Sequence, residues 1–300
     1  MPRIRAHDGR SLHVRVIGRG PQIVLLHGFG MESRHWLPVI LPLAHRFQFI
    51  LPDFRGFGGS SRHACTEDCI LTSHAQDVHG VLEQLAGPQP VGLGGISLGA
   101  STALRYMELY GTARVRRYLH IDQSPRIGHD DSWPWGIFGA EGPAQLARWQ
   151  PFLDRLASFP ADTPFTALPA DLREQFYEDL GYFLAKALSK PWMKWGARRA
   201  ASVPLLAHEL VPVDNWYTLY QHMRAYAERD YNFLPLLPQL ELPVRVMVGR
   251  HSEMYPWAGQ LRMLDLLPNA DLVVMENSGH VPLVDQPLRF IRELSAAFAH

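Results

Sequence analysis

Short runs of apolar residues, bounded by glycine, proline or aspartate, recur along the chain and indicate β-strands. Two runs that alternate polar and apolar positions, 4–6 and 12–17, flank Asp8-Gly9, a pair typical of tight turns, so we expect an N-terminal hairpin. Uninterrupted apolar strands are typical of parallel sheets, because helices cover both faces. Six further runs are almost continuously apolar: 23–26, 47–51, 91–93, 118–121, 244–248 and 272–275.

Helical patterns separate several of these runs, which indicates an open α/β sheet. One helix is expected to begin at a cap formed by Thr72 or Ser73 and to continue through Leu85. A second covers 98–109 and ends before Gly111, a residue type suited to the left-handed conformation that closes many helices.

Between residues 125 and 238 the alternation stops and the pattern becomes helical, with Asp214 or Asn215 as a candidate helix cap. We therefore expect 125–238 to be a helical cap, or lid, inserted into a core formed by 1–124 and 239–300. Two sets of apolar residues each share one helix face: Leu172, Phe176, Leu180, Phe183, Leu184 and Leu188, and then Trp216, Leu219, Tyr220, Met223 and Tyr226. Six of the eight tryptophans lie in this segment: Trp133, Trp135, Trp149, Trp192, Trp195 and Trp216.

The motif Gly95-Ile96-Ser97-Leu98-Gly99 lies between the apolar run 91–93 and a helical pattern. A nucleophile on a tight strand-to-helix turn needs small residues two positions before and after it, because the turn is crowded. We therefore expect Ser97 to be a catalytic nucleophile.

The motif His27-Gly28-Phe29-Gly30 directly follows the run 23–26. A glycine-rich loop there can direct a backbone N–H at the negative charge that develops during acyl transfer. We expect the N–H groups of Phe29 and Leu98 to form an oxyanion hole, and His27 to have a structural role.

Asn277-Ser278-Gly279-His280 follows the last apolar run. A histidine on a loop that leaves the carboxyl end of a parallel strand can reach a nucleophile at the same sheet edge. We expect His280 to take the proton of Ser97 and to return it to the leaving group.

Together with Pro52-Asp53-Phe54-Arg55-Gly56-Phe57-Gly58, these motifs occur in the order found in the α/β-hydrolase superfamily, which the chain resembles over essentially its whole length. The resemblance implies an α/β fold with a mostly parallel eight-stranded sheet flanked by helices and a helical cap after the sixth strand. It also implies a Ser–His–acid triad, no cofactor or metal, and a structural role for the loop 53–58.

The acid departs from the family's common pattern, an aspartate in G-x-x-D after the seventh strand. Here Ser252 takes that place in Gly249-Arg250-His251-Ser252-Glu253, and a serine holds no charge against an imidazolium. Asp122 ends the sixth strand, where haloalkane dehalogenases and zearalenone-lactone hydrolases carry their acid. We favour Asp122 because a strand end fixes its backbone, and Glu253 stays open as the alternative acid.

The nucleophile narrows the reaction. Haloalkane dehalogenases and epoxide hydrolases resemble this architecture but use an aspartate, whereas serine forms an acyl-enzyme with esters, thioesters, lactones or activated amides. We expect a carboxylesterase or lactonase. A carbon–carbon bond hydrolase, a perhydrolase or a lyase stays open, because the fold and the triad do not define the reaction. A ligand sensor with slow turnover also stays open, on the grounds of the displaced acid and the aromatic lid.

Aromatic residues of the expected lid favour an apolar substrate of small to medium size. Trp133 and Trp135 follow Asp122 closely, and we expect them to line the substrate pocket. The apolar surface of the lid could equally form a homodimer interface.

Composition limits the partners. The 300 residues include 29 Lys plus Arg and 29 Asp plus Glu, which is no basic excess and argues against nucleic-acid binding. No run of eighteen apolar residues or apolar signal core is present, so we expect a cytoplasmic protein without a membrane span. Cys65 and Cys69, with His63 and His74 nearby, lack the four-ligand spacing of structural zinc, and we expect two reduced thiols.

Overall fold

The computed structural model describes residues 3–65, 69–201 and 216–299. Within these residues a single sheet has the strand order β1-β2-β4-β3-β5-β6-β7-β8. The first two pairings, β1 with β2 and β2 with β4, are antiparallel, and all later ones are parallel. The strands are β1 Arg3–Arg5, β2 Ser11–Gly18, β3 Gln22–Leu26, β4 Gln48–Pro52, β5 Val91–Ile96, β6 Val115–Ile121, β7 Val244–Gly249 and β8 Ala270–Met275.

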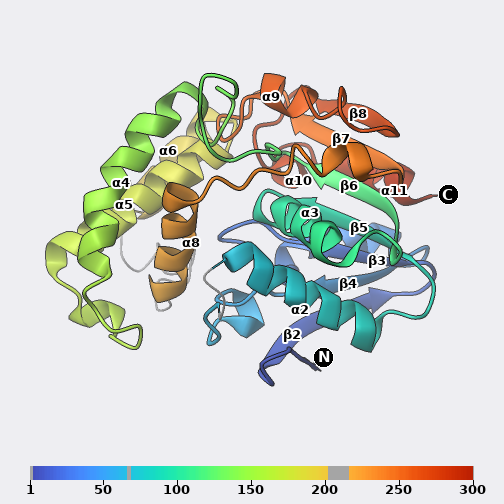
Figure 1. Cartoon of the computed structure of the whole chain (residues 1–300), viewed down its shortest axis with the longest axis horizontal. Helices are drawn as coiled ribbons and strands as arrows, with labels where there is room; N and C mark the ends of the chain where they lie inside the picture. The colour runs from blue at the N-terminus through green and yellow to red at the C-terminus, as the bar shows by residue number, and fades with distance from the viewer. Residues whose placement is uncertain (1–2, 66–68, 202–215, 300) are drawn as a thin grey trace.

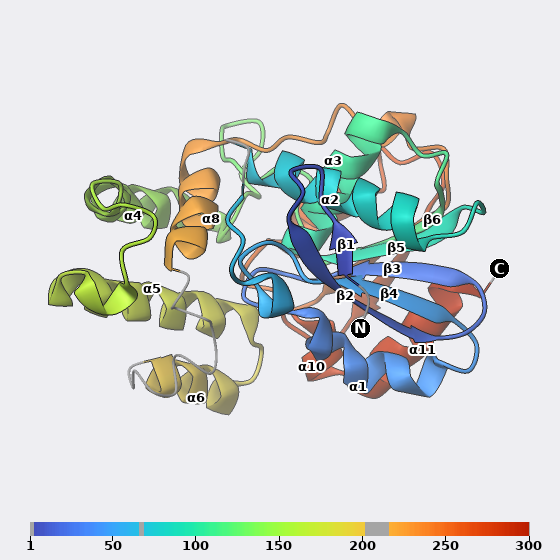
Figure 2. The same ribbon diagram turned by 90° about the horizontal axis from the view of Figure 1, so that it is seen from below.

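This sheet confirms the predicted fold class, the hairpin and the six apolar strands. Strands β3 and β5 are buried at nearly every position, as expected for strands covered on both faces. Helices α2 (Ile70–Leu85) and α3 (Leu98–Tyr110) cover one face, and α1 (Leu37–Ile40), α10 (Pro282–Asp285) and α11 (Pro287–Phe298) cover the other (Figures 1 and 2).

Two helix boundaries test the sequence patterns. Helix α3 is followed by Gly111 at φ +72°, which confirms the predicted C-terminal glycine. The predicted cap of α2 at Thr72 or Ser73 is wrong: the helix begins at Ile70 and Cys69 is its N-cap. The buried side chains of Ile70 and Leu71 extend the helix by a turn, because their packing outweighs the capping preference of a hydroxyl.

Between β6 and β7 the chain forms helices α4 (Gly142–Leu156), α5 (Ala170–Ala187), α6 (Pro191–Ala201) and α8 (Trp216–Glu228). They lie beyond one end of the sheet, to the left in Figures 1 and 2. Helix α5 buries Leu172, Phe176, Leu180 and Phe183 of the predicted face, with Leu184 partly buried.

The last residue of that predicted face, Leu188, is not helical; it is the extended C-cap, at ψ 148°. The next helix, α6, begins three residues later at Pro191, and this proline disfavours helical conformation in the residue before it, Lys190, so the two helices stay separate. The apolar face predicted for α8 is buried throughout. Its candidate caps, Asp214 and Asn215, lie outside the described residues.

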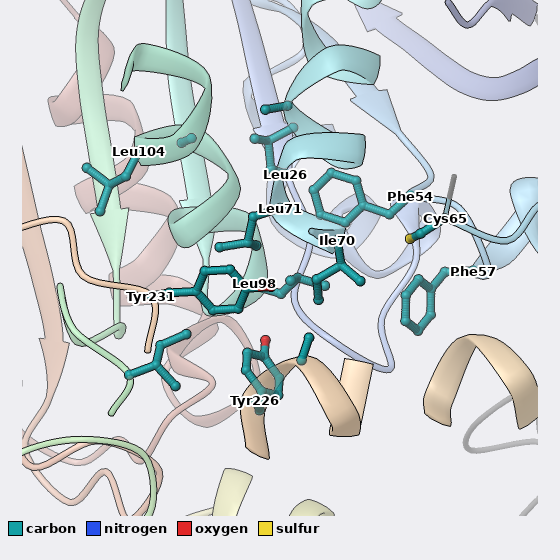
Figure 3. Close-up of a cluster of buried hydrophobic side chains, with 14 of the residues drawn as sticks. Leu26, Phe54, Phe57, Cys65, Ile70, Leu71, Leu98, Leu104, Tyr226 and Tyr231 are labelled. Carbon is teal, nitrogen blue, oxygen red and sulfur yellow. The ribbon is translucent and has the colours of Figure 1, made fainter. Parts of the chain in front are cut away.

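The apolar core beneath the helices between β6 and β7 is continuous with the core on one face of the sheet. Tyr226 of α8 lies close to Leu98, the first residue of α3, and to Ile70 of α2 (Figure 3). The helices between β6 and β7 therefore pack directly on the edge of the sheet at which β5 ends.

Among the described residues, no helix is both long and apolar enough to cross a bilayer.

Candidate active site

The predicted site residues meet at one edge of the sheet. Ser97 follows β5, Asp122 follows β6, and the loop with His280 follows β8. These strands are parallel and lie in the order β5-β6-β7-β8, so their carboxyl ends share one edge. Residues that are far apart in sequence are thereby brought together.

Ser97 occupies a sharp strand-to-helix turn with φ 54° and ψ −122°. A Cβ atom on Gly95 would lie 2.4 Å from the carbonyl carbon of Gly99, and one on Gly99 would lie 2.2 Å from the carbonyl oxygen of Leu26. Both glycines are therefore required by close backbone approach. The backbone of Ser97 is held in a conformation that residues other than glycine rarely adopt, and such conformations cluster at functional sites.

Asp122 and His280 are in direct contact. Nδ1 of His280 donates a hydrogen bond to Oδ1 of Asp122 at 2.9 Å, and both residues are buried. Asp122 has φ 41°, a left-handed conformation that aspartate tolerates better than most residues. The bond to Nδ1 leaves Nε2 of a neutral His280 as the proton acceptor.

The carboxylate of Asp122 is oriented by further donors. Its Oδ2 accepts the backbone N–H of Gly249 at 2.6 Å, and its Oδ1 accepts the hydroxyl of Ser252 at 2.7 Å and the amide of Gln260 at 3.4 Å. Ser252 therefore supports Asp122 from the position where the sequence pattern led us to look for an acid. Sequence reasoning missed this role, although a polar residue at that position was the available signal.

Glu253 points away from this network. Its side chain is 44% exposed and pairs with Lys186 at 3.4 Å and with Lys194. Ser252 and Glu253 are neighbours, and the loop turns the serine inward and the glutamate outward. Of the two carboxylates predicted as candidates, the structure brings Asp122 to His280.

The loop that carries His280 is held by a residue the sequence did not single out. Buried Asp285 accepts the backbone N–H of Gly279 at 2.8 Å and the hydroxyl of Ser278 at 3.3 Å. A Cβ atom on Gly249 would lie 1.9 Å from the carbonyl oxygen of Gly279. The end of β7 and the loop after β8 therefore pack backbone against backbone beside the histidine.

The two expected oxyanion donors are the N–H of Phe29, one residue after Gly28, and the N–H of Leu98, one residue after Ser97. In the described part of the chain, no oxygen accepts a hydrogen bond from the N–H of Phe29 or of Leu98. Leu98 is the first residue of α3, where N–H groups have no partner within the helix and the helix dipole favours negative charge. The loop with Phe29 contacts the turn at Ser97, because a Cβ atom on Gly28 would lie 3.5 Å from Cβ of Ser97, an ordinary van der Waals distance.

His27 holds the loop and has no free nitrogen. Its Nδ1 donates to the carbonyl oxygen of Gly28 at 2.8 Å, and its Nε2 accepts the N–H of Phe54 at 3.0 Å. Burial lowers the pKa of His27 to about 4, so the ring is neutral near pH 7. This geometry agrees with the structural role that we expected for His27.

The loop 53–58 is likewise tied by hydrogen bonds. Asp53 accepts the N–H of Ser33 at 2.6 Å and the N–H of Gly59 at 2.8 Å. The guanidinium of Arg55 is fully buried between Asp77 and Asp8, and its hydrogen bond holds the pKa of Asp8 at about 2. None of these groups contacts Ser97 or His280, which agrees with a structural loop.

An apolar pocket lies between Phe29 and the helices that follow β6. The ring of Phe29 contacts that of Phe183 at 5.0 Å between centroids. The pocket therefore begins at the residue after Gly28, in the loop that contacts Ser97. Its lining is almost entirely apolar: Phe29, Trp149, Phe176, Asp179, Leu180, Phe183, Leu219, Met223 and Tyr226.

The predicted pocket residues Trp133 and Trp135 do not line this pocket. Their rings pack against each other at 5.2 Å between centroids, and the indole of Trp133 donates to the carbonyl oxygen of Arg126. The segment turns back on itself here, with a bridge between Asp130 and Trp133. Of the tryptophans in the helical segment, Trp149 reaches the pocket, because its helix faces α5 and α8.

The chain belongs to the α/β-hydrolase fold family, whose model matches residues 21–287. A pimeloyl-[acyl-carrier protein] methyl ester esterase of Nitrosomonas europaea is 26% identical over 94% of this chain and 97% of that protein. An AB hydrolase superfamily protein of Bacillus subtilis is 25% identical over 99% and 98%. An esterase from Exiguobacterium antarcticum has a similar fold, with a TM-score of 0.73 at 23% identity and 99% coverage of both chains.

Proposed function

We propose that this chain is a cofactor-independent serine hydrolase that cleaves carboxylic esters or lactones. The observation that carries the proposal is the contact of His280 with buried Asp122, at the sheet edge where Ser97 occupies its strained turn. The methyl ester esterases among the relatives support an ester as the substrate.

The groups at this edge suit acyl transfer. Nε2 of His280 takes the proton of Ser97 as Oγ attacks the carbonyl carbon, and Asp122 stabilises the imidazolium that forms. The N–H groups of Phe29 and Leu98 receive the oxyanion. The proton then passes to the leaving alcohol, and water attacks the acyl-enzyme by the same route, releasing the acid and restoring Ser97.

The substrate has a small to medium apolar acyl or alcohol group. The pocket that begins at Phe29 is lined by aromatic and aliphatic side chains, which stabilise such a group by excluding it from water. The helices between β6 and β7 act as a lid over the sheet edge. A carbon–carbon bond hydrolase, a perhydrolase or a lyase would need the same residues. Turnover of simple esters, tested below, distinguishes an esterase from these three.

The displaced acid and the aromatic lid are the two features that favour a sensor with slow turnover, and an aromatic lid suits a hydrolase equally well. Asp122 accepts the hydrogen bond from His280 that an acid after β7 would accept in other members of the family. The relocation thus gives no physical reason for slow turnover. We therefore retain the hydrolase as the proposed function.

The test is intact-mass measurement after incubation with a fluorophosphonate, which labels an activated serine without requiring the substrate. We expect one adduct on the wild type and on the exposed-serine control Ser158→Ala, and none on Ser97→Ala. Turnover of p-nitrophenyl esters should follow the same pattern. Equal labelling of Ser97→Ala, or no adduct on folded wild type, would overturn the proposal.

A further inference from the structure

A second cluster of reactive side chains lies outside the candidate active site. His74 of α2 and His222 of α8 face each other with their Nε2 atoms 3.1 Å apart. Sγ of Cys65 lies 3.9 Å from Nε2 of His74, and the three ligand atoms lie within 4.8 Å of one another. All three residues are buried. The cluster therefore joins the core helix α2 to a helix of the proposed lid.

The hydrogen bond of His222 to the backbone fixes which ring nitrogen carries the proton, and leaves Nε2 as an electron-pair donor. Nδ1 of His222 faces the carbonyl oxygen of Thr218 at 2.7 Å and must carry the proton. With the proton on Nδ1, the lone pair of Nε2 is directed at His74, 3.1 Å away. A backbone carbonyl on the outer nitrogen is also how proteins orient histidines that bind metals.

The spacing of the three atoms is close to that of a metal site. For bonds of about 2.0 Å to nitrogen and about 2.3 Å to sulfur, ligand atoms around one ion lie roughly 3.3 to 3.8 Å apart. Two of the separations in this cluster, 3.1 Å and 3.9 Å, differ from that range by a few tenths of an ångström, and the third lies within 4.8 Å. An ion would bind after side-chain adjustments that bring Cys65 and His222 toward each other.

The surroundings select the kind of ion. The ring of Phe54 stacks on His74 at 4.4 Å, and that of Phe57 meets His222 edge-on at 5.3 Å. Figure 3 shows these two phenylalanines beside the sulfur of Cys65. Calcium and magnesium prefer oxygen ligands, whereas a thiolate with imidazoles selects Cu(I) or Zn(II). Cu(I) with one thiolate is electrically neutral, which suits an apolar interior better than the net charge that Zn(II) would leave.

We propose that Cys65, His74 and His222 form a binding site for a thiophilic metal ion, with Cu(I) preferred over Zn(II). On binding, the thiol of Cys65 releases one proton to solvent, and its thiolate and the Nε2 lone pairs of the two histidines bond to the ion. His74 carries its remaining proton on Nδ1. No electron is transferred.

The site would couple the lid to the oxyanion loop. The ring of His222 lies 5.5 Å from that of Phe29, the residue whose N–H we assign to the oxyanion hole. One turn earlier in α8, Thr218 packs so closely that a Cβ on Gly56 would lie 1.9 Å from its Cγ2. A bound ion would therefore restrain α8 against both the core and the loop that carries Phe29.

The test uses the full chain, made metal-free with chelators and kept reduced. Cu(I) is titrated in competition with bicinchoninate, and Zn(II) in competition with a chromophoric zinc chelator. We expect one Cu(I) per chain, a thiolate-to-metal charge-transfer absorption, and a rise in Tm. Cys65→Ser should abolish this absorption, whereas the matched control Cys69→Ser should keep it.

His222→Gln should weaken binding at least tenfold, and His63→Gln, a histidine outside the cluster, should not. Circular dichroism and fluorophosphonate labelling of Ser97 establish that each variant is folded; if His222→Gln is not, Cys65→Ser decides. Absence of a one-to-one complex with either ion, or a complex that Cys65→Ser retains, would overturn the site. Binding of Zn(II) alone with the same residue dependence would support the site and overturn the choice of Cu(I).

Discussion

The hydroxyl of Ser252 donates a hydrogen bond to Oδ1 of Asp122 at 2.7 Å. Ser252 follows β7, at the position where the sequence pattern led us to look for an acid, and Asp122 follows β6, the neighbouring strand of the sheet. The two positions therefore face the same histidine from adjacent strand ends, and the residue at one supports the carboxylate at the other.

Replacement of each candidate acid by its amide distinguishes Asp122 from Glu253 directly. Asp122→Asn should lower kcat by about 10⁴, because an amide facing Nδ1 of His280 favours the wrong tautomer. Glu253→Gln should change kcat less than twofold, because it removes only an exposed ion pair with Lys186 and Lys194. The measurement is steady-state hydrolysis of a p-nitrophenyl ester. A large loss in Glu253→Gln would contradict the assignment.

The facing positions also predict a rescue. Ser252→Asp in the Asp122→Asn background restores a carboxylate beside His280, so we expect the double variant to recover at least tenfold in kcat over Asp122→Asn. Ser252→Ala alone removes one hydrogen bond and should lower kcat only severalfold. The matched control is Asp122→Asn with Glu253→Asp, which leaves the carboxylate on the outer side of the loop. Equal activity of the two double variants would contradict the prediction.

Buried histidines predict loss of stability in mild acid. Burial is the main cause that lowers the pKa of His27, His120 and His222 to about 4. Below pH 6.5 the unfolded chain binds protons at these residues and the folded chain does not, so their stabilisation is present above pH 6.5 and lost as pH falls toward 4. Three such groups give a slope of up to about 4 kcal/mol per pH unit.

Urea unfolding at several pH values between 7 and 4.5 measures that slope. His120→Gln should reduce this slope by the contribution of about one proton, which is roughly a third of it. His7→Gln, at an exposed position, should leave the slope unchanged. A free energy of unfolding that stays constant between pH 6.5 and 5 would contradict the protonation states described for the core.

The pocket predicts a change in chain-length preference. Phe183 contacts Phe29 and lines the pocket, so Phe183→Ala should raise kcat/KM for a p-nitrophenyl octanoate relative to the acetate by about tenfold. Trp133→Ala should leave the ratio unchanged, because Trp133 packs in the loop outside this pocket. The reverse outcome would restore the sequence-based assignment of the pocket.

Local sequence determined the parts of this protein that depend on neighbouring residues. The run of buried residues in β5, the glycines two positions either side of Ser97 and the glycine that closes α3 are local requirements of backbone geometry, so their patterns predicted the structure. The same reasoning failed at the start of α2, where tertiary burial of Ile70 and Leu71 outweighed a capping preference.

Only the tertiary structure decided which distant residues meet. The sequence left two acids for His280, and the direction of the loop after β7 turned Ser252 inward and Glu253 outward. Their order along the chain led us to expect Trp133 and Trp135 in the pocket, whereas the packing of the helices brought Trp149 there instead. His222 lies 148 positions after His74 in the chain, yet it meets His74 and Cys65 in one cluster. Local spacing does not indicate this pairing, because the packing of strands and helices brings residues together independently of their separation along the chain.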